Sequence, residues 1–297
     1  METLSLLGKP VAESLYSALQ PRISSLLTKN ITPALAVVLV GDDPASKLYV
    51  GSKTRAFKRL GLISETFNYP ATISEDELLG VIDKLNADPR FHGILVQLPL
   101  PGAIDSNRVL LRVDPLKDVD GFHPTNLGLL LSGQPRYIPC TPHGILAILE
   151  HYKIPVAGRH AVIVGRSNIV GKPLMALLAN KWERGNATVT ICHTGTTDLA
   201  QYTRQADLLV VASGRPGLIT ADMVRPGVDI VDVGMNRVPD DSEKGYRLVG
   251  DVAAEEMLGR AHSLTPVPGG VGPMTVAMLV HNTVAAAELT AGGSGSA

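Results

Sequence analysis

Three side chains with functional groups recur at helical spacing early in the chain, namely Ser46, Tyr49 and Lys53. Residues three and four apart lie on one face of an α-helix, so a hydroxyl, a phenol and an amine are stacked along one side. If that face looks into a cleft, burial favours the neutral amine, which can then act as a base. If it faces open water, the lysine is an ordinary exposed cation. The rest of the chain decides between these two interpretations.

The element that must carry these side chains has both of its ends marked in the sequence. Asp43 can accept hydrogen bonds from free backbone N–H groups, Pro44 suits the first helical position, and Gly61 can close the far end. These signals predict a single helix within residues 42–61.

Strand and helix patterns alternate over the first half of the chain. The apolar runs predict buried strands at 35–40, 63–69 and 93–98, and helices at 11–27 (interrupted near Pro21) and 74–86. This alternation is typical of parallel βα units, in which ligands bind beyond the carboxyl ends of the strands. Gln97 stands at such an end, and so does the start of the helix that carries Lys53. We expect the two side chains to share a site.

The second half predicts a nucleotide-binding sheet. Residues 160–165 are expected to form an apolar strand that enters Gly165-Arg-Ser-Asn-Ile-Val-Gly171, and helices are expected at 144–151, 174–182 and 275–288. A glycine turn before a helix exposes backbone N–H groups to an anion. Ser167 replaces the second glycine of the usual Gly-x-Gly-x-x-Gly pattern, and Gly171 comes one residue late. Further strands expected at 187–192, 207–212 and 228–233 strengthen the interpretation as a doubly wound sheet.

The residues after the second of these strands favour NADP over NAD. An NAD site normally places an acidic residue there to bind the ribose 2′-hydroxyl, but this chain has His193 and Thr194. Arg166 lies in the neighbouring turn, and a cation with hydroxyl donors suits a 2′-phosphate. The alternative is that Arg166 is a plain surface arginine.

Composition limits the remaining possibilities. At 297 residues, the chain suits two domains, and 45% hydrophobic residues indicate a folded protein. A net charge of -1 and short apolar runs argue against nucleic acid or a membrane as partners. Cys140 and Cys192 lack zinc spacing, so we expect no metal, and the missing secretory signal favours the cytoplasm. The small residues 291–297 are expected to form a disordered tail.

Seven motifs in order closely resemble the bifunctional methylenetetrahydrofolate dehydrogenase/methenyltetrahydrofolate cyclohydrolase family. They are Ser46-x-x-Tyr49-Val50-x-x-Lys53, Gly93-Ile-Leu-Val-Gln-Leu-Pro-Leu-Pro101, Lys117-Asp-Val-Asp-Gly121, Pro139-Cys-Thr-Pro142, Gly165-Arg-Ser-x-Ile-Val-Gly-x-Pro173, Gly250-Asp-Val252 and Pro266-x-Pro-Gly-Gly-Val-Gly-Pro-Met-Thr275. The resemblance covers nearly the whole chain and also accounts for Ser167 in the turn. It implies an α/β fold of two domains, each with a mainly parallel sheet flanked by helices, the second of Rossmann type, with the active site in a cleft between them.

The resemblance also implies two reactions on a tetrahydrofolate substrate. Methylenetetrahydrofolate passes a hydride to NADP, and the methenyl product is hydrolysed to 10-formyltetrahydrofolate. By the family's pattern, Lys53 handles protons in the hydrolysis with Gln97 orienting it, Tyr49 stacks on the folate, and Asp120 binds the pterin. Asp118 and Asp120, taken from the residues alone, could equally be solvated loop carboxylates. The other residues implied are Leu98, Pro268, Gly269 and Gly270 for the folate, and Gly165, Arg166, Ser167, Thr194 and Met235 for the nucleotide.

The domain division expected is 1–140 with 272–297 for folate and catalysis, and 141–271 for NADP. The resemblance further suggests a homodimer. Two other functions stay open at this point. One is a dehydrogenase without the hydrolase step, against which the presence of Lys53 argues. The other is a non-catalytic dinucleotide-binding protein, which would make the seven motifs incidental.

Overall fold

The computed structural model describes residues 2–242 and 245–293. Its internal contacts divide the chain into two compact units. Unit 1 comprises Met1–Glu13, Leu130–Gln134 and Thr141–Thr275, and unit 2 comprises Ser14–Leu129, Pro135–Cys140 and Val276–Ala297. The chain passes from one unit to the other within helices α1 (Gly8–Thr28) and α10 (Val271–Gly293), and also after residues 129, 134 and 140.

Unit 2 is built on a three-stranded parallel sheet in the order β3-β2-β4. The strands are β2 (Ala34–Val40), β3 (Ile63–Tyr69) and β4 (Gly93–Val96), and the helices are α2 (Pro44–Arg59), α3 (Glu75–Ala87), α4 (Ser106–Arg112) and α5 (Pro124–Leu131). All seven residues of the central strand β2 are buried, which its uninterrupted apolar sequence requires. The register places Val38 between Phe67 and Val96.

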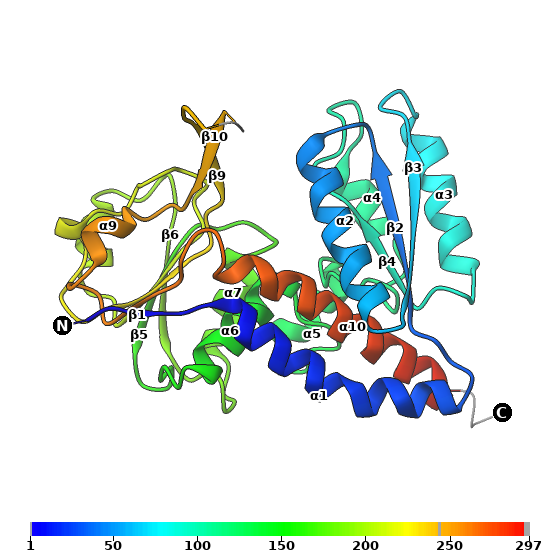
Figure 1. Cartoon of the computed structure of the whole chain (residues 1–297), viewed down its shortest axis with the longest axis horizontal. Helices are drawn as coiled ribbons and strands as arrows, with labels where there is room; N and C mark the ends of the chain where they lie inside the picture. Colours follow the sequence, from blue (N-terminus) through cyan, green and yellow to red (C-terminus); the bar gives the residue numbers. More distant parts are fainter. Residues whose placement is uncertain (1, 243–244, 294–297) are drawn as a thin grey trace. The chain divides into compact units, whose positions relative to one another are not determined.

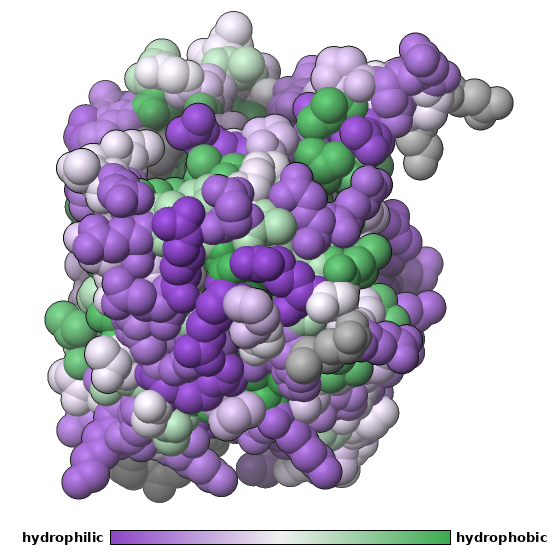
Figure 2. Space-filling view, turned by 90° about the vertical axis from the view of Figure 1, so that its left-hand side faces the viewer, coloured by the Kyte–Doolittle hydropathy of each residue, from purple (hydrophilic) through white to green (hydrophobic). Residues whose placement is uncertain are grey.

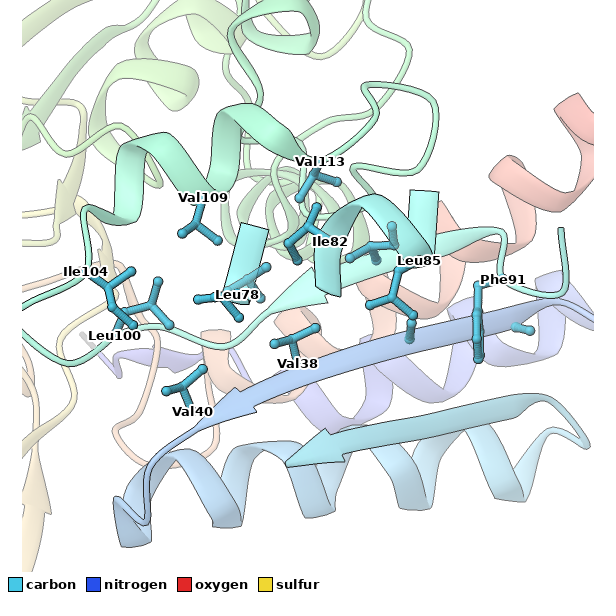
Figure 3. Close-up of a cluster of buried hydrophobic side chains, with 14 residues drawn as sticks. Val38, Val40, Leu78, Ile82, Leu85, Phe91, Leu100, Ile104, Val109 and Val113 are labelled. Carbon is cyan, nitrogen blue, oxygen red and sulfur yellow. The ribbon is translucent and has the colours of Figure 1, made fainter. Parts of the chain in front are cut away.

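The core of unit 2 lies on one face of this sheet. Alternate residues of β2, among them Val38 and Val40, point toward Leu78 and Ile82 of α3 and Val109 of α4. Figure 3 shows these side chains meeting in one continuous apolar cluster. The alternation follows from the two-residue period of a strand. It fixes which face of β2 the two helices cover.

Unit 1 is built on a six-stranded sheet in the order β1-β11-β8-β7-β5-β6, in which all neighbours are parallel. The strands are β1 (Leu4–Ser5), β5 (His160–Val164), β6 (Thr188–Cys192), β7 (Leu208–Val211), β8 (Asp229–Asp232) and β11 (Ser263–Leu264). The helices are α6 (Cys140–His151), α7 (Gly171–Ala179), α8 (Leu199–Thr203), the 3-10 turn η1 (Ala221–Met223) and α9 (Ala254–Met257). A hairpin of β9 (Asn236–Pro239) and β10 (Tyr246–Val249) stands apart from the sheet in Figure 1.

The strand order of unit 1 reverses at β5. The next strand along the chain, β6, pairs with β5 on one side, and β7 pairs with it on the other. In doubly wound sheets, the crevice for a ligand opens at this reversal, outside the carboxyl ends of the strands. The loops after β5 and β7 are therefore where a nucleotide is expected. The face of unit 1 in Figure 2 is mostly hydrophilic, with apolar residues in small patches.

Most predicted elements are confirmed, and where they differ from the structure the difference concerns helix ends. The short helices α4, α5, α8 and α9 and the strands β1, β9, β10 and β11 were not predicted. The interruption predicted at Pro21 is wrong, because α1 continues through this exposed position. The helices predicted to begin at 144, 174 and 275 begin at Cys140, Gly171 and Val271. Of the expected tail, 291–293 belong to α10, and 294–297 lie outside the described residues. Within the described part of the chain, no helix combines the length and apolar character needed to span a membrane.

Candidate active site

Lys53 is a buried lysine with a defined partner. Lys53 is only 8% exposed, and its Nζ donates a hydrogen bond to Gln97 Oε1 at 3.0 Å. The Gln97 amide nitrogen donates to the carbonyl of Leu98 at 2.7 Å, which turns the amide oxygen toward the lysine. The interpretation of Lys53 as an exposed cation is wrong. Tyr49, one turn earlier on the same face, is 41% exposed and therefore accessible to a ligand.

The helix that presents these side chains is fixed at its first turn. Asp43 accepts a hydrogen bond from the Ser46 backbone N–H at 2.7 Å, and Pro44 occupies the first position of α2. This satisfies one free N–H at the helix start and favours helical backbone from there on. Gln97 is fixed independently, because its backbone N–H extends the β2–β4 pairing by donating to the Val38 carbonyl at 2.9 Å. The strand and the helix thus bring the two predicted residues together.

Asp120 is part of the same electrostatic environment. Burial raises the pKa of its carboxyl, whereas the charge of Lys53 and a hydrogen bond from the Cys140 thiol act in the opposite direction. Cys140 is 2% exposed, and burial together with the Asp120 charge raises the pKa of its thiol well above the ordinary value. The site in unit 2 therefore combines an amine, an amide and a carboxyl.

Asp118, two residues away, has a structural role. Its carboxylate is buried and accepts hydrogen bonds from the backbone N–H groups of Phe122 and His123 and from the Asn126 side chain, the last two at 2.8 Å. Burial raises the pKa of Asp118 to about 6, against these hydrogen bonds. Asp118 therefore shapes the loop that carries Asp120.

The turn after β5 in unit 1 needs both of its glycines. A Cβ on Gly165, whose φ is +133°, would lie 2.2 Å from the Ala212 carbonyl oxygen. A Cβ on Gly171 would lie 2.0 Å from the Gly165 oxygen. Ser167 holds the turn by accepting from the Val170 N–H at 3.1 Å. Val170 gives α7 no side-chain cap, Pro173 has no N–H, and the Lys172 N–H donates to the Ser167 carbonyl at 3.1 Å. In the first turn of α7, the Gly171 N–H is therefore the donor that suits a phosphate.

The remaining nucleotide residues predicted for unit 1 are accessible. Arg166 and Ser167 are exposed in the turn, and Thr194 is exposed after β6, where no acidic residue follows the strand. Met235 is 41% exposed and packs near Gly272 at the start of α10. The residues present therefore fit a dinucleotide with a 2′-phosphate, because the glycine turn admits the diphosphate and a cation stands beside it.

Two buried carboxylates hold the loops around this crevice, and sequence reasoning gave neither a role. Asp251 accepts from the backbone N–H groups of Ser213 and Gly214, which follow β7, at 2.6 and 2.8 Å. Asp232, at the end of β8, accepts from the Gly234 and Asp251 N–H groups, each at 2.9 Å. Burial raises the pKa of Asp232 to about 6. The motif Gly250-Asp-Val252 was the available signal, but it gave no partner for its carboxylate.

Pro268, Gly269 and Gly270 lie in unit 1, just before α10. The Gly269 carbonyl accepts from the Gly8 N–H at 2.9 Å, and the Gly270 N–H donates to the Pro266 carbonyl at 2.8 Å. Gly269 has a φ of +109°, which requires glycine. The loop has a fixed backbone that a ligand can approach closely. Within residues 2–242 and 245–293, no cluster of three or more His, Cys, Asp or Glu side chains is arranged to hold a metal ion.

Two family models match the chain. The model of the tetrahydrofolate dehydrogenase/cyclohydrolase catalytic domain matches residues 6–120, and that of the NAD(P)-binding domain matches residues 139–291. The bifunctional protein FolD of an Exiguobacterium species (strain ATCC BAA-1283 / AT1b) is 53% identical over 281 residues, covering 95% of this chain and 97% of that protein.

Solved structures agree with these matches. The bifunctional FolD dehydrogenase/cyclohydrolase of Campylobacter jejuni is 46% identical with a TM-score of 0.91, covering 97% of this chain and 99% of that one. The Trypanosoma brucei dehydrogenase-cyclohydrolase, solved with NADP and an inhibitor, is 34% identical with a TM-score of 0.92, covering 98% and 99%. With the motifs in order and the glycine turn and lysine site in place, the chain belongs to the tetrahydrofolate dehydrogenase/cyclohydrolase family.

Proposed function

We propose that the chain oxidises 5,10-methylenetetrahydrofolate to 5,10-methenyltetrahydrofolate with NADP and hydrolyses the product to 10-formyltetrahydrofolate in the same active site. The observation that carries this proposal is the buried Lys53, hydrogen-bonded to Gln97 at 3.0 Å and electrostatically coupled to Asp120. A dehydrogenase alone has no need of a buried amine, because oxidation of the methylene carbon gives a delocalised cation without acid–base help. The protein is thus a bifunctional enzyme of one-carbon metabolism.

For the oxidation, the chain supplies binding and orientation. Bound NADP provides the hydride acceptor. The Gly171 N–H at the start of α7 and the turn residues Gly165 and Ser167 bind the diphosphate, and Arg166 with Thr194 binds the 2′-phosphate side. Met235 adds an apolar contact to the nucleotide.

For the hydrolysis, Lys53 moves the protons. Water adds to the methenyl carbon, its oxygen forms the new C–O bond, and one of its protons passes to Lys53 Nζ. Lys53 Nζ returns that proton to N5 as the C–N5 bond breaks. The remaining hydroxyl proton of the adduct leaves to water as the C=O bond forms, so the formyl group stays on N10. Gln97 keeps the amine pointed at the reacting carbon through its hydrogen bond.

The folate contacts follow from the chemistry of the side chains. The ring of the exposed Tyr49 stacks on the flat pterin, and the Asp120 carboxylate accepts from its amino-pyrimidine edge. Leu98 adds an apolar contact beside Gln97. Pro268, Gly269 and Gly270 line the folate pocket with a rigid backbone.

Three further features belong to the proposal. Unit 2 is the folate-binding domain and unit 1 is the NADP-binding domain, a division that differs from the expected 1–140 with 272–297 and 141–271 at Met1–Glu13, Leu130–Gln134 and 272–275. The enzyme acts as a homodimer, which sedimentation of the purified protein tests. It works in the cytoplasm, which suits two free, buried thiols.

The test follows both reactions in one assay. With NADP and 5,10-methylenetetrahydrofolate, the wild type should form NADPH and then lose the methenyl absorbance. Lys53→Met keeps the length and apolar stem of the side chain but removes the amine. It should lower the hydrolysis rate by at least a hundredfold while NADP still binds, since general acid–base groups contribute about 10²–10⁴-fold.

The same assay separates the competing functions. Wild-type protein that makes NADPH but never hydrolyses the methenyl product would be a dehydrogenase alone. Protein that binds NADP without turning over the folate would be a non-catalytic nucleotide-binding protein. Full hydrolysis by Lys53→Met would remove Lys53 from its role.

A further inference from the structure

Helix α10 carries a buried amide that none of the roles above uses. Asn282 is 2% exposed, and its Nδ2 donates to two main-chain carbonyls, Val119 O at 2.8 Å and Ile138 O at 2.9 Å. An amide nitrogen has two N–H bonds, so both are used. The neighbouring His281 ring nitrogen lies 3.3 Å from the Asn282 amide oxygen, which helps to fix the orientation of the amide.

The two carbonyls belong to the segments that carry Asp120 and Cys140. Asp120 directly follows Val119, and Cys140 comes two residues after Ile138. The Cys140 sulfur lies 3.6 Å from Val119 O and 3.8 Å from the Asn282 nitrogen. One side chain from α10 therefore joins both segments at the point where the Asp120 carboxyl meets its thiol donor.

The backbone next to Asp120 leaves little room for adjustment. Gly121 has a φ of +75°, and a Cβ there would lie 2.9 Å from the Pro139 nitrogen. Segment 119–121 thus packs directly against segment 138–140, and a change in their spacing moves Asp120. If the two buried carbonyls lost their donor, they would be left without a hydrogen bond, which costs free energy. A movement of the segments that gave them new donors would then be favoured.

We propose that Asn282 is a positioning residue for the folate reaction, which holds Asp120 opposite Lys53 by tying segment 119–121 to segment 138–140. This inference rests on the proposed function, since it gives Asp120 the pterin contact. Asn282 touches neither substrate nor cofactor in this role. It acts only through Asp120.

The test is a double-mutant cycle on the Michaelis constant for 5,10-methylenetetrahydrofolate. Asn282→Leu keeps a similar shape and removes both donated hydrogen bonds. We expect Asn282→Leu and Asp120→Ala each to raise the folate KM at least tenfold, with the NADP KM unchanged within twofold. Because both act through the same carboxylate, the double variant should match Asp120→Ala within twofold.

The matched control is the next residue of the same helix. Thr283 is fully buried, and its hydroxyl donates to the Leu279 carbonyl of its own helix at 2.8 Å. Thr283→Val removes one buried hydrogen bond from α10 without touching either segment, so the folate KM should stay within twofold of wild type. If Asn282→Leu does not fold, Asn282→Ser replaces it in the double-mutant cycle with Asp120→Ala. Serine is smaller than asparagine and keeps one hydrogen-bond donor.

The outcomes distinguish this inference from the proposed function. If Asp120→Ala leaves the folate KM unchanged, the pterin contact is wrong and the role of Asn282 is wrong with it. If Asp120→Ala raises KM but the Asn282 variants do not, only the positioning role is overturned. If the two effects multiply, Asn282 acts independently of Asp120, which also overturns the inference.

Discussion

Lys53 and Gln97 are hydrogen-bonded to each other, and the backbone of each residue is held in place by a different interaction. Lys53 depends on the capped helix α2, and Gln97 depends on its ladder bond to Val38. A buried amine and amide at 3.0 Å need such support, because an unpaired polar group in this place costs about 1–3 kcal/mol. The helix and the strand end therefore hold the two side chains in fixed positions, which a flexible loop would not.

Arg166 allows a direct test of cofactor choice at a single residue. Its exposed guanidinium stands in the turn after β5, where a 2′-phosphate is the group that separates NADP from NAD. Arg166→Ala should reduce the NADP-to-NAD ratio of kcat/KM by about ten- to a hundredfold, since a hydrogen bond to a charged group contributes about 1.5–3 kcal/mol.

The control for this variant is another exposed arginine of unit 1. Arg184 pairs with Glu150 at 3.0 Å, away from the turn after β5 in sequence, and Arg184→Ala should leave the cofactor ratio unchanged. The cofactor ratio is measured with each nucleotide at saturating folate. An unaltered ratio in Arg166→Ala would reject the 2′-phosphate contact.

Residue types alone did not separate Asp118 from Asp120. Both are aspartates of one loop, and only the coordinates show that Asp118 accepts three hydrogen bonds while Asp120 meets Lys53 and Cys140. The pairing of Lys53 with Gln97 was predictable, because the strand end and the helix start were both visible in the sequence. The partners of Asp118 lie within eight residues of it but depend on the folded shape of the loop, and the partners of Asp120 are long-range contacts that no local pattern encodes.

Among the elements, the β5–turn–α7 unit depends on close backbone approach at two glycines. Gly171→Ala would place a Cβ 2.0 Å from the Gly165 oxygen, so the turn must open. We expect at least a tenfold weaker NADP affinity, measured by fluorescence titration. Gly80→Ala in α3 is the control, because no atom lies within 4 Å of its Cβ. NADP binding as tight as in wild type would show that the turn tolerates the methyl group.

Three helix starts were predicted too late for one physical reason. Helices α6, α7 and α10 each have a proline at their third position, Pro142, Pro173 and Pro273. Each predicted helix start came after its proline. The N–H groups of a first turn have no partner within the helix, so proline is tolerated there. By contrast, Asp43 and Ser74 are side-chain caps, and the helix starts that they mark were predicted correctly.

At the scale of the whole molecule, each unit has its own sheet and its own apolar core. The parallel sheets were predictable from the alternation of strand and helix. The pairing of β1 with β11 was not, because Leu4–Ser5 is two residues long and too short to show a period. It joins residues more than 250 positions apart, and such a pairing leaves no local signal.

Both units carry a buried carboxyl with a raised pKa, and this makes stability depend on pH. The folded pKa of Asp118 is about 6 against 3.8 as the ordinary value. A carboxyl that holds its proton more tightly in the folded state stabilises fully below pH 3.8, and this contribution is lost as pH rises through about 6. The change is about 3 kcal/mol.

The measurement is urea unfolding at several pH values across this window, on wild type and Asp118→Asn. The free energy of unfolding of the wild type should fall relative to that of the variant between about pH 4 and 6. The free energy of unfolding of the wild type should fall in the same way relative to that of Asp232→Asn, because the pKa of Asp232 is also raised to about 6. Parallel pH curves for wild type and variants would contradict the prediction.

The two cysteines of the chain lie one in each unit, Cys192 in unit 1 and Cys140 in unit 2, and both are almost completely buried. A thiol enclosed in this way meets an alkylating reagent only when its surroundings open. The alkylation rate of each cysteine therefore reports how readily its own unit opens. The order in which the two sulfurs become alkylated in mild denaturant reports which half loosens first, without any introduced label.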